Sequence, residues 1–212
     1  MATIKFGTSG WREIIARDFT FDNVRLATQG IADYLSKVQS PKSKVVILGY
    51  DTRFLAKEFA LASAEVLAAN HFEPLLCDRD TPTPVIAHTI RHRKAIGGIN
   101  FTASHNPPEY QGLKFSTSNG APATPAVTKQ IEANIVKLQS KNFSFKGAVI
   151  GTYHCKTFNP QPDYFKQIHK LVDFSILKKA KLKVAVDFSY GTAHGYLDKL
   201  LESAGAKVFL FH

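Results

Sequence analysis

One loop of the sequence, residues 101–112, collects side chains that could perform covalent catalysis through a hydroxyl group. It follows an apolar stretch of strand length and holds a serine, a histidine, an asparagine, a glycine and two consecutive prolines. The prolines restrict the backbone, which helps to hold the hydroxyl of Ser104 in one place. A serine hydroxyl needs a neighbouring base or electrostatic help to act as a nucleophile. His105 is adjacent, and Lys114 could reach back from the following strand.

Two other interpretations of this loop compete with covalent catalysis by phosphoryl or similar transfer, and the residues support them unequally. Serine, asparagine and proline favour turns through local hydrogen bonds, so the segment could be a turn without chemistry. A serine hydrolase would need a nucleophile-elbow pattern, which the loop lacks, and His105 is too close in sequence to face Ser104 easily as its base.

Other residues are weaker candidates for a functional site. His88 and His92 stand four apart on an expected helix, a spacing that suits a metal. No third ligand is apparent, and the neighbouring basic residues, Arg91, Arg93 and Lys94, would repel a cation. A solvated basic helix end is therefore expected. Residues 78–80 (Asp-Arg-Asp) resemble an acidic metal cluster only superficially, and the basic run 178–183 is expected to be a solvated linker.

The elements that must position these residues follow from hydrophobic periodicity. Residues 44–50 are a continuous apolar run and predict a strand buried on both faces. Strands are expected at 44–50, 73–77, 95–101, 113–116, 182–187 and 207–211. Helices are expected at 22–37, 55–69, around 86–90, 124–138, 165–172 and 196–204. Strands alternating with helices indicate an α/β layered fold.

Composition limits the partners. The net charge of +10 and the pI near 9.6 call for an anionic partner, which could be nucleic acid, an acidic membrane or a phosphorylated small molecule. No nucleic-acid-binding motif and no aromatic-basic stripe is visible, so no nucleic acid is expected. No signal core and no spanning apolar run occurs, so no membrane partner is expected. With only Cys77 and Cys155, a reducing compartment fits best, and we expect a soluble cytoplasmic protein.

Four segments share their residues and their order with one enzyme family. They are residues 7–12 (Gly-Thr-Ser-Gly-Trp-Arg), 49–53 (Gly-Tyr-Asp-Thr-Arg), 102–107 (Thr-Ala-Ser-His-Asn-Pro) and 110–114 (Tyr-Gln-Gly-Leu-Lys). Residues 184–187 followed by Gly191 are similar to the start of its second domain. The chain thus resembles the N-terminal part of the α-D-phosphohexomutases, which include phosphoglucomutases and phosphomannomutases.

The resemblance implies the fold and the domains. It implies a layered mixed sheet with flanking helices, plus the beginning of a second, similar α/β domain. Residues 1–155 would form the phosphoserine-bearing domain 1, residues 156–181 a connecting helix and linker, and residues 182–212 an incomplete start of domain 2. Because the sequence stops one strand–helix–strand unit into that domain, we expect a fragment whose partners include the remaining domains of a parent enzyme.

The resemblance also implies a mechanism. Ser104 would be phosphorylated and would exchange its phosphoryl group with a phosphorylated hexose through a hexose 1,6-bisphosphate, interconverting hexose 1-phosphate and hexose 6-phosphate. Lys114 would be the general acid or base, and His105 would position the phosphoserine. Arg12 would be both a catalytic and a phosphate-binding residue. The other residues that would contact phosphate or substrate are Ser9, Asn106 and Arg53.

The sequence lacks three loops that the family uses to bind metal, sugar and phosphate. The family binds Mg²⁺ through an Asp-Gly-Asp-Gly-Asp-Arg loop, with the phosphoserine (here Ser104) as a further ligand, and no such loop occurs here. Its sugar-recognition and phosphate-binding loops are also missing. The sequence therefore does not identify which hexose would be the substrate. We therefore expect the isolated chain to be inactive. The alternative is a non-catalytic phosphosugar-binding protein.

Overall fold

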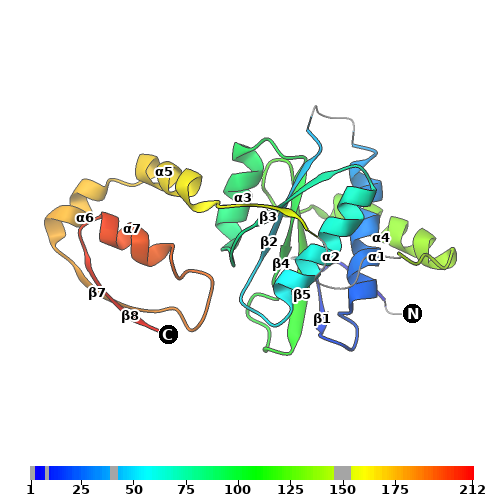
Figure 1. Ribbon diagram of the computed structural model, residues 1–212, viewed down its shortest axis with the longest axis horizontal. Coiled ribbons are helices and arrows are strands. Elements are labelled where there is room, and N and C mark those ends of the chain that lie inside the picture. Colours follow the sequence, from blue (N-terminus) through cyan, green and yellow to red (C-terminus); the bar gives the residue numbers. More distant parts are fainter. Residues whose placement is uncertain (1–2, 8–9, 39–42, 146–153) are drawn as a thin grey trace.

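The centre of the molecule is a six-stranded mixed sheet with helices on both faces (Figure 1). The structure is a computed structural model that describes residues 3–7, 10–38, 43–145 and 154–212. The strands are β1 (Trp11–Ile14), β2 (Val45–Tyr50), β3 (Glu73–Cys77), β4 (Gly97–Phe101), β5 (Tyr110–Thr117) and β6 (Lys156–Phe158). Their order is β1-β5-β4-β2-β3-β6. Strands β4, β2, β3 and β6 run parallel, whereas β5 is antiparallel to both β4 and β1.

Helix α3 (Thr83–His92) covers one face of this sheet. Helices α1 (Phe21–Leu35), α2 (Ala56–Ala69) and α4 (Pro125–Ser140) lie on the other side (Figure 1). The sequence expectation of a layered mixed sheet with flanking helices is confirmed.

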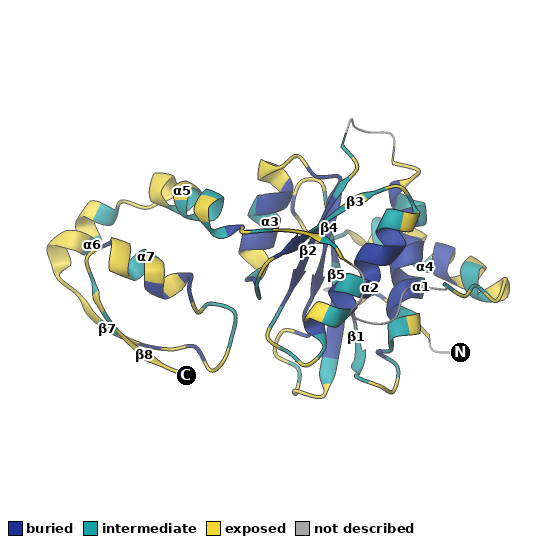
Figure 2. Ribbon diagram, in the orientation of Figure 1, coloured by how far each residue is buried: buried dark blue, intermediate teal, exposed yellow. Residues whose placement is uncertain are grey.

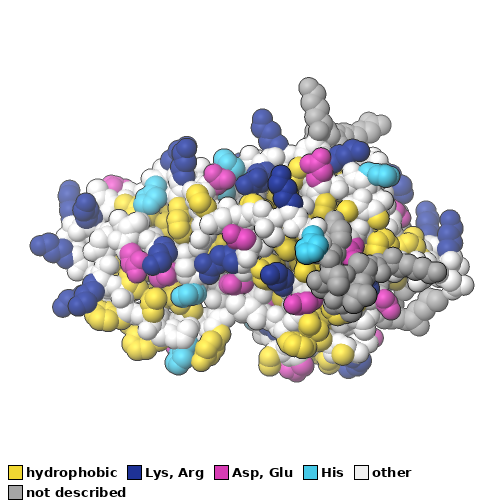
Figure 3. All heavy atoms as spheres, viewed as in Figure 1, with side chains coloured by type: hydrophobic (Ala, Val, Ile, Leu, Met, Phe, Trp, Pro, Cys, Tyr) yellow, Lys and Arg dark blue, Asp and Glu magenta, His cyan; other side chains and the backbone are white. Residues whose placement is uncertain are grey.

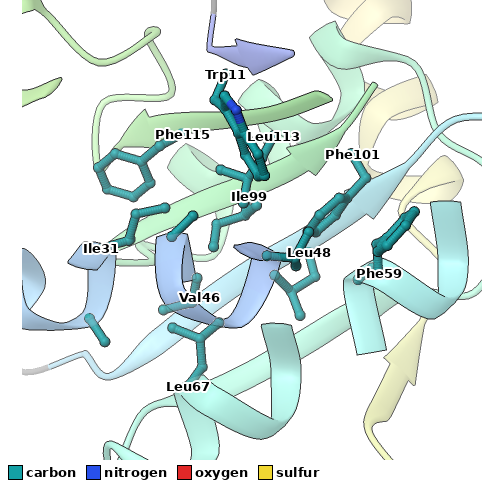
Figure 4. Close-up of a cluster of buried hydrophobic side chains, with 14 of the residues drawn as sticks. Trp11, Ile31, Val46, Leu48, Phe59, Leu67, Ile99, Phe101, Leu113 and Phe115 are labelled. Atoms are coloured by element: carbon teal, nitrogen blue, oxygen red, sulfur yellow. The ribbon is translucent and has the colours of Figure 1, made fainter. Parts of the chain in front are cut away.

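The larger hydrophobic core lies between the sheet and α1 and α2. Figure 4 shows side chains from the sheet and from both helices meeting there, among them Trp11, Leu48, Phe59, Phe101 and Leu113. Phe59 packs edge-on against Phe19 and parallel to Phe101, and such aromatic pairs add stability beyond their buried area. A smaller core under α3 consists of Ile47, Cys77, Ile86, Ile90 and Ala95.

Strand alternation then decides where the polar residues of the central strands point. Ile99, Leu113 and Phe115 face the larger core, so their neighbours in β4 and β5 face the α3 side. Those neighbours include Asn100 and Lys114. Helix α3 can lie close to the sheet because a Cβ at Gly49 would be 2.1 Å from Cδ1 of Ile86. The polar residues of β4 and β5 therefore share one face with α3.

The C-terminal unit is smaller and more exposed (Figure 2). It contains α5 (Gln161–Leu171), α6 (Phe174–Ala180), β7 (Lys183–Asp187), α7 (Leu197–Ser203) and β8 (Lys207–Phe211). Strands β7 and β8 form a two-stranded parallel sheet, the arrangement expected of one strand–helix–strand unit. Several large apolar side chains of β8 are exposed, including Phe209 and Phe211.

Three elements lie where the sequence predicts none. Strands β1 and β6 are short edge strands, and β6 extends the main sheet by pairing with β3. Helix α6 occupies part of the run expected to be a linker, although its lysines, Lys178 and Lys179, are exposed as expected. Lys and Arg side chains are spread over the visible face of the molecule instead of forming one patch (Figure 3). Within the described ranges, no helix has both the length and the apolar character needed to cross a membrane.

Candidate functional site

The serine loop begins where β4 ends, and its backbone is locally unusual. Ser104 is exposed and has a φ of 59°, in the left-handed region that non-glycine residues rarely adopt. Its N–H donates to Oγ1 of Thr102 at 3.0 Å, and the N–H of Asn106 donates to the carbonyl of Ala103 at 3.2 Å. Thr102 and Ala103 are buried. The loop is thus anchored at its start and presents Ser104 outward, and such backbone strain is concentrated at functional sites.

Arg53 holds the loop from the opposite side. Nη1 donates to the carbonyl oxygens of Pro107 at 2.7 Å and Tyr110 at 3.0 Å. Nη2 donates to the carbonyl oxygens of Ser104 at 3.1 Å and Asn106 at 2.6 Å. A guanidinium is suited to this because its donors form a rigid planar fork. The serine loop therefore closes around the Arg53 side chain.

Asp51 completes this arrangement. Its Oδ2 lies 3.3 Å from Nε of Arg53, and its Oδ1 accepts the N–H of Arg53 at 3.0 Å. Both side chains are largely buried, with 13% of Asp51 and 15% of Arg53 exposed. The donors of Arg53 are thereby directed at the loop carbonyls and at Asp51. Asp51 and Arg53 pair their charges here, while the cap position of α2 is occupied by Leu55.

Arg12 approaches the loop from β1. Its Nη1 donates to Oδ1 of Asn106 at 2.8 Å. In the β1–β5 pairing, Arg12 stands opposite Gly112, and a Cβ at Gly112 would lie 2.9 Å from Cγ of Arg12 and 2.6 Å from the carbonyl oxygen of Thr102. Only glycine leaves room for both neighbours. Gly112 thus allows Arg12 and the start of the serine loop to lie together.

Lys114 lies on β5, two residues beyond Gly112, and is about half-buried. Burial lowers the pKa of its ammonium group, the positive charge of Arg12 lowers it further, and Asp51 opposes both. A lysine with a lowered pKa has more of the neutral amine at physiological pH, so it can both accept and donate a proton.

An open groove of about 770 Å³ lies between the serine loop and the C-terminal unit. One side is formed by residues 51–54 and by loop residues that include Ser104, His105 and Asn106, and the other side by residues 189–192. The groove is wide enough for a small polar molecule, and the exposed Ser104 lies in its wall.

Of the residues expected in the site, Ser104, His105 and Asn106 share the groove wall, and Arg12 and Arg53 contact the loop. Ser9 lies outside the described residues. Sequence reasoning missed Thr102 and Asn100, although Asn100 stood out as a polar residue within an apolar strand.

His88 and His92 lie on α3, away from the serine loop. Their rings are 5.4 Å apart, and Nε2 of His92 lies 3.4 Å from Oδ2 of Asp163 in α5. Burial lowers the pKa of His88, and so does His92. In the part of the chain that the structure describes, no group of three or more His, Cys, Asp and Glu residues could hold a metal ion.

Known proteins similar to this chain come from one enzyme family, the family that the sequence motifs indicate. The family described as "Phosphoglucomutase/phosphomannomutase, alpha/beta/alpha domain I" matches residues 3–142. A phosphoglucomutase of Staphylococcus epidermidis is 31% identical over 98% of this chain and 38% of its own length. A phosphoglucosamine mutase of Alkaliphilus oremlandii is 32% identical over 98% of this chain and 45% of its own length.

A solved structure agrees with this. A protein of Thermus thermophilus, provisionally assigned as a phosphomannomutase, superposes with a TM-score of 0.83 and 32% identity, over 99% of this chain and 45% of that one. The chain thus spans less than half the length of each of these three relatives.

Proposed function

The chain belongs to the phosphoglucomutase/phosphomannomutase family, and we propose that it supplies the phosphoserine side of a phosphohexomutase active site. In this proposal Ser104 carries the phosphoryl group that is exchanged with a hexose phosphate. The observation that carries it is the position of Ser104, exposed in the wall of a groove on a loop that Arg53 holds through four carbonyl oxygens.

Phosphoryl transfer suits this arrangement because it depends mainly on alignment and on neutralising charge. Arg12 and Lys114 bring positive charge to the region of the loop, and His105 lines the same groove as Ser104. Arg12 can bind phosphate oxygens with two parallel hydrogen bonds, and Asn106, which it contacts, would act beside it. The donors of Arg53 are used within the loop, so we assign it the task of positioning Ser104.

In the transfer step, the bond between phosphorus and Oγ of Ser104 breaks while phosphorus bonds to a hydroxyl oxygen of the hexose phosphate. The proton of that hydroxyl must reach Oγ of the serine. Lys114 would carry it, since its lowered pKa lets the amine accept the proton and return it. The product is a hexose bisphosphate, which gives a phosphoryl group back to Ser104 from its other end.

The family resemblance also implies Mg²⁺, with the phosphate of Ser104 among its ligands. The residues that the structure describes do not fit such a site by themselves, because they contain no cluster of three or more His, Cys, Asp and Glu side chains that could bind a metal. A hard cation of this kind needs several oxygen ligands. No step above depends on a metal.

We further propose that the isolated chain binds hexose phosphates without sustained turnover, because one wall of a shared cleft holds the substrate incompletely. The division into residues 1–155, 156–181 and 182–212 remains part of this proposal, with β6 marking the end of the main sheet inside the middle segment.

The experiment is to incubate the chain with glucose or mannose 1,6-bisphosphate, locate any phosphorylated residue by mass spectrometry, and run a coupled mutase assay beside it. The Staphylococcus epidermidis relative serves as positive control. A phosphoryl group on Ser104 with little turnover is expected. Sugar binding without phosphorylation of Ser104 would favour a non-catalytic phosphosugar-binding protein, and rapid turnover would contradict the proposed inactivity of the chain.

A further inference from the structure

Asn100 is a buried polar residue in the middle of an apolar strand. It lies in β4, between Ile99 and Phe101, and only 6% of it is exposed. In the antiparallel pairing of β4 with β5 it stands directly opposite Lys114. Directly opposed residues project to the same face of a sheet and are close enough to interact. Asn100 is therefore the cross-strand neighbour of the lysine that the proposed function uses as its proton carrier.

The amide of Asn100 is held in one orientation. Its Nδ2 donates to Oγ1 of Thr83, in the first turn of α3, at 3.1 Å. Its Oδ1 is buried, and no donor among the described residues reaches it. A buried carbonyl oxygen without a partner costs on the order of 1–3 kcal/mol, so such an atom calls for an explanation.

The two side chains also share a cavity. Asn100, Thr83 and Lys114 line a partly open cavity of about 90 Å³, and the rest of its wall includes apolar side chains such as Ile86 and Phe115. A cavity of this size has room for roughly three water molecules, and water there would have the side chains of Asn100, Thr83 and Lys114 as polar partners. The unpartnered oxygen and the lysine thus meet in a space that could hold bridging water.

We propose that Asn100 is a positioning residue for Lys114, whose amine donates a hydrogen bond to Oδ1 of Asn100, directly or through water in this cavity. The proposal rests on the role of Lys114 in the proposed function. A nearby carbonyl oxygen favours the protonated amine. It therefore works with Asp51 and against burial and Arg12, which are the other influences on the pKa of Lys114.

The consequence is a defined proton affinity for Lys114. Burial and Arg12 both weaken the hold of the amine on its proton, and an unanchored lysine would also sample several rotamers. With Oδ1 of Asn100 as an acceptor, the amine keeps one direction and retains enough affinity to take up the proton of an attacking hydroxyl.

The test is competitive acetylation of the amine groups of the whole chain as a function of pH, with the peptide that contains Lys114 quantified by mass spectrometry. Asn100→Leu removes the acceptor and keeps the branched shape of the side chain. One lost hydrogen bond to a charged group should raise the reactivity of Lys114 at neutral pH about tenfold. Asn100→Asp keeps the shape and adds a negative charge, so it should lower the reactivity. The exposed Lys179 serves as internal reference.

Thr89→Val is the matched control, because Thr89 is a buried polar residue of α3 that does not line the cavity. It should leave the pH profile of Lys114 unchanged. Equal profiles for wild type and Asn100→Leu, or raised reactivity in Asn100→Asp, would overturn the proposal. If Asn100→Leu does not fold, the reactivity of Lys114 in Asn100→Asp still tests the proposal. This readout needs no phosphoryl transfer, so absence of a phosphoryl group on Ser104 would refute the proposed function and leave the pairing of Asn100 with Lys114 standing.

Discussion

Replacing Arg53 with alanine should loosen the serine loop while leaving the sheet intact. The side chain donates to four carbonyl oxygens of the loop, two of them exposed and two, those of Asn106 and Tyr110, partly buried. The exposed oxygens regain hydrogen bonds from water after the substitution. Each of the other two costs about 1 kcal/mol when its partner is removed, so local opening of the loop should become easier by roughly 2 kcal/mol. That corresponds to about a 30-fold larger population of the open loop.

Amide hydrogen exchange measures this population directly. In the loop, the N–H of Asn106 bonds to the carbonyl of Ala103, and the N–H of Tyr110 bonds to the carbonyl of Pro107. Both amides should exchange about 30-fold faster in Arg53→Ala, whereas the amides of β2 should keep their wild-type rates. Arg53→Lys should give an intermediate effect, since one ammonium group cannot serve both pairs of carbonyl oxygens.

Arg17→Ala is the control, because Arg17 is exposed and forms ion pairs with Glu13 and Asp18 on the surface. It should change no loop amide. Unchanged rates for Asn106 and Tyr110 in Arg53→Ala would show that the arginine does not hold the loop. An equal increase in β2 and in the loop would show that Arg53 acts through the stability of the whole domain.

Three further predictions concern the surroundings of the site. The pKa of Lys114 is lowered on folding from 10.5 by burial and by Arg12, so the unfolded chain binds more protons between the folded-state pKa and pH 10.5, and at lower pH the charged lysine destabilises the folded state by a constant amount. Lys114→Met should therefore be more stable than wild type at neutral pH in urea unfolding; a gain that persists above pH 10.5 would argue against this cause. The pKa of His88 is likewise lowered, from 6.5, mainly by burial, so the wild type should lose stability as pH falls below 6.5. His88→Asn should show a weaker loss in acid thermal melts, and identical pH slopes would refute the reasoning. Gly112→Ala should lower the free energy of unfolding by about 1–3 kcal/mol, because the new Cβ would lie 2.6 Å from the carbonyl of Thr102. Wild-type stability in a denaturant titration would speak against this crowding.

Much of the main sheet could be predicted from the sequence, since its central strands carry their signal locally. Residues 44–50 are apolar throughout, and β2 occupies Val45–Tyr50 with its neighbours on both sides. Strand β1 carries no such signal, because Arg12 and Glu13 interrupt its four residues and only the pairing with β5 makes it a strand. Strand β6 has three residues and depends on β3 in the same way. Edge strands of this length are set by tertiary contacts that local patterns do not contain.

In the candidate site, too, some features could be predicted from the local sequence and others depend on tertiary contacts. The loop after β4 and its exposed serine could be predicted, because prolines and turn-forming residues follow an apolar strand. The hydrogen bonds from Arg53 to this loop could not be predicted. Their acceptors lie 51 to 57 positions away along the chain and are backbone carbonyls, which carry no sequence signal. The same holds for Oδ1 of Asn100. The sequence marks the residue as polar, and only the packing of β4 against β5 and α3 shows that the atom has no donor among the described residues.

The most direct test of the account is transfer from Ser104 to a sugar. The chain is phosphorylated with hexose 1,6-bisphosphate, freed of donor, and mixed with glucose 1-phosphate, while phosphoserine and sugar bisphosphate are measured over time. The account predicts that hexose bisphosphate appears in proportion to the phosphoryl group lost from Ser104, and that Ser104→Ala gives none. Phosphoserine that persists, or that yields inorganic phosphate without any sugar bisphosphate, would contradict the assignment of Ser104 as the phosphoryl carrier.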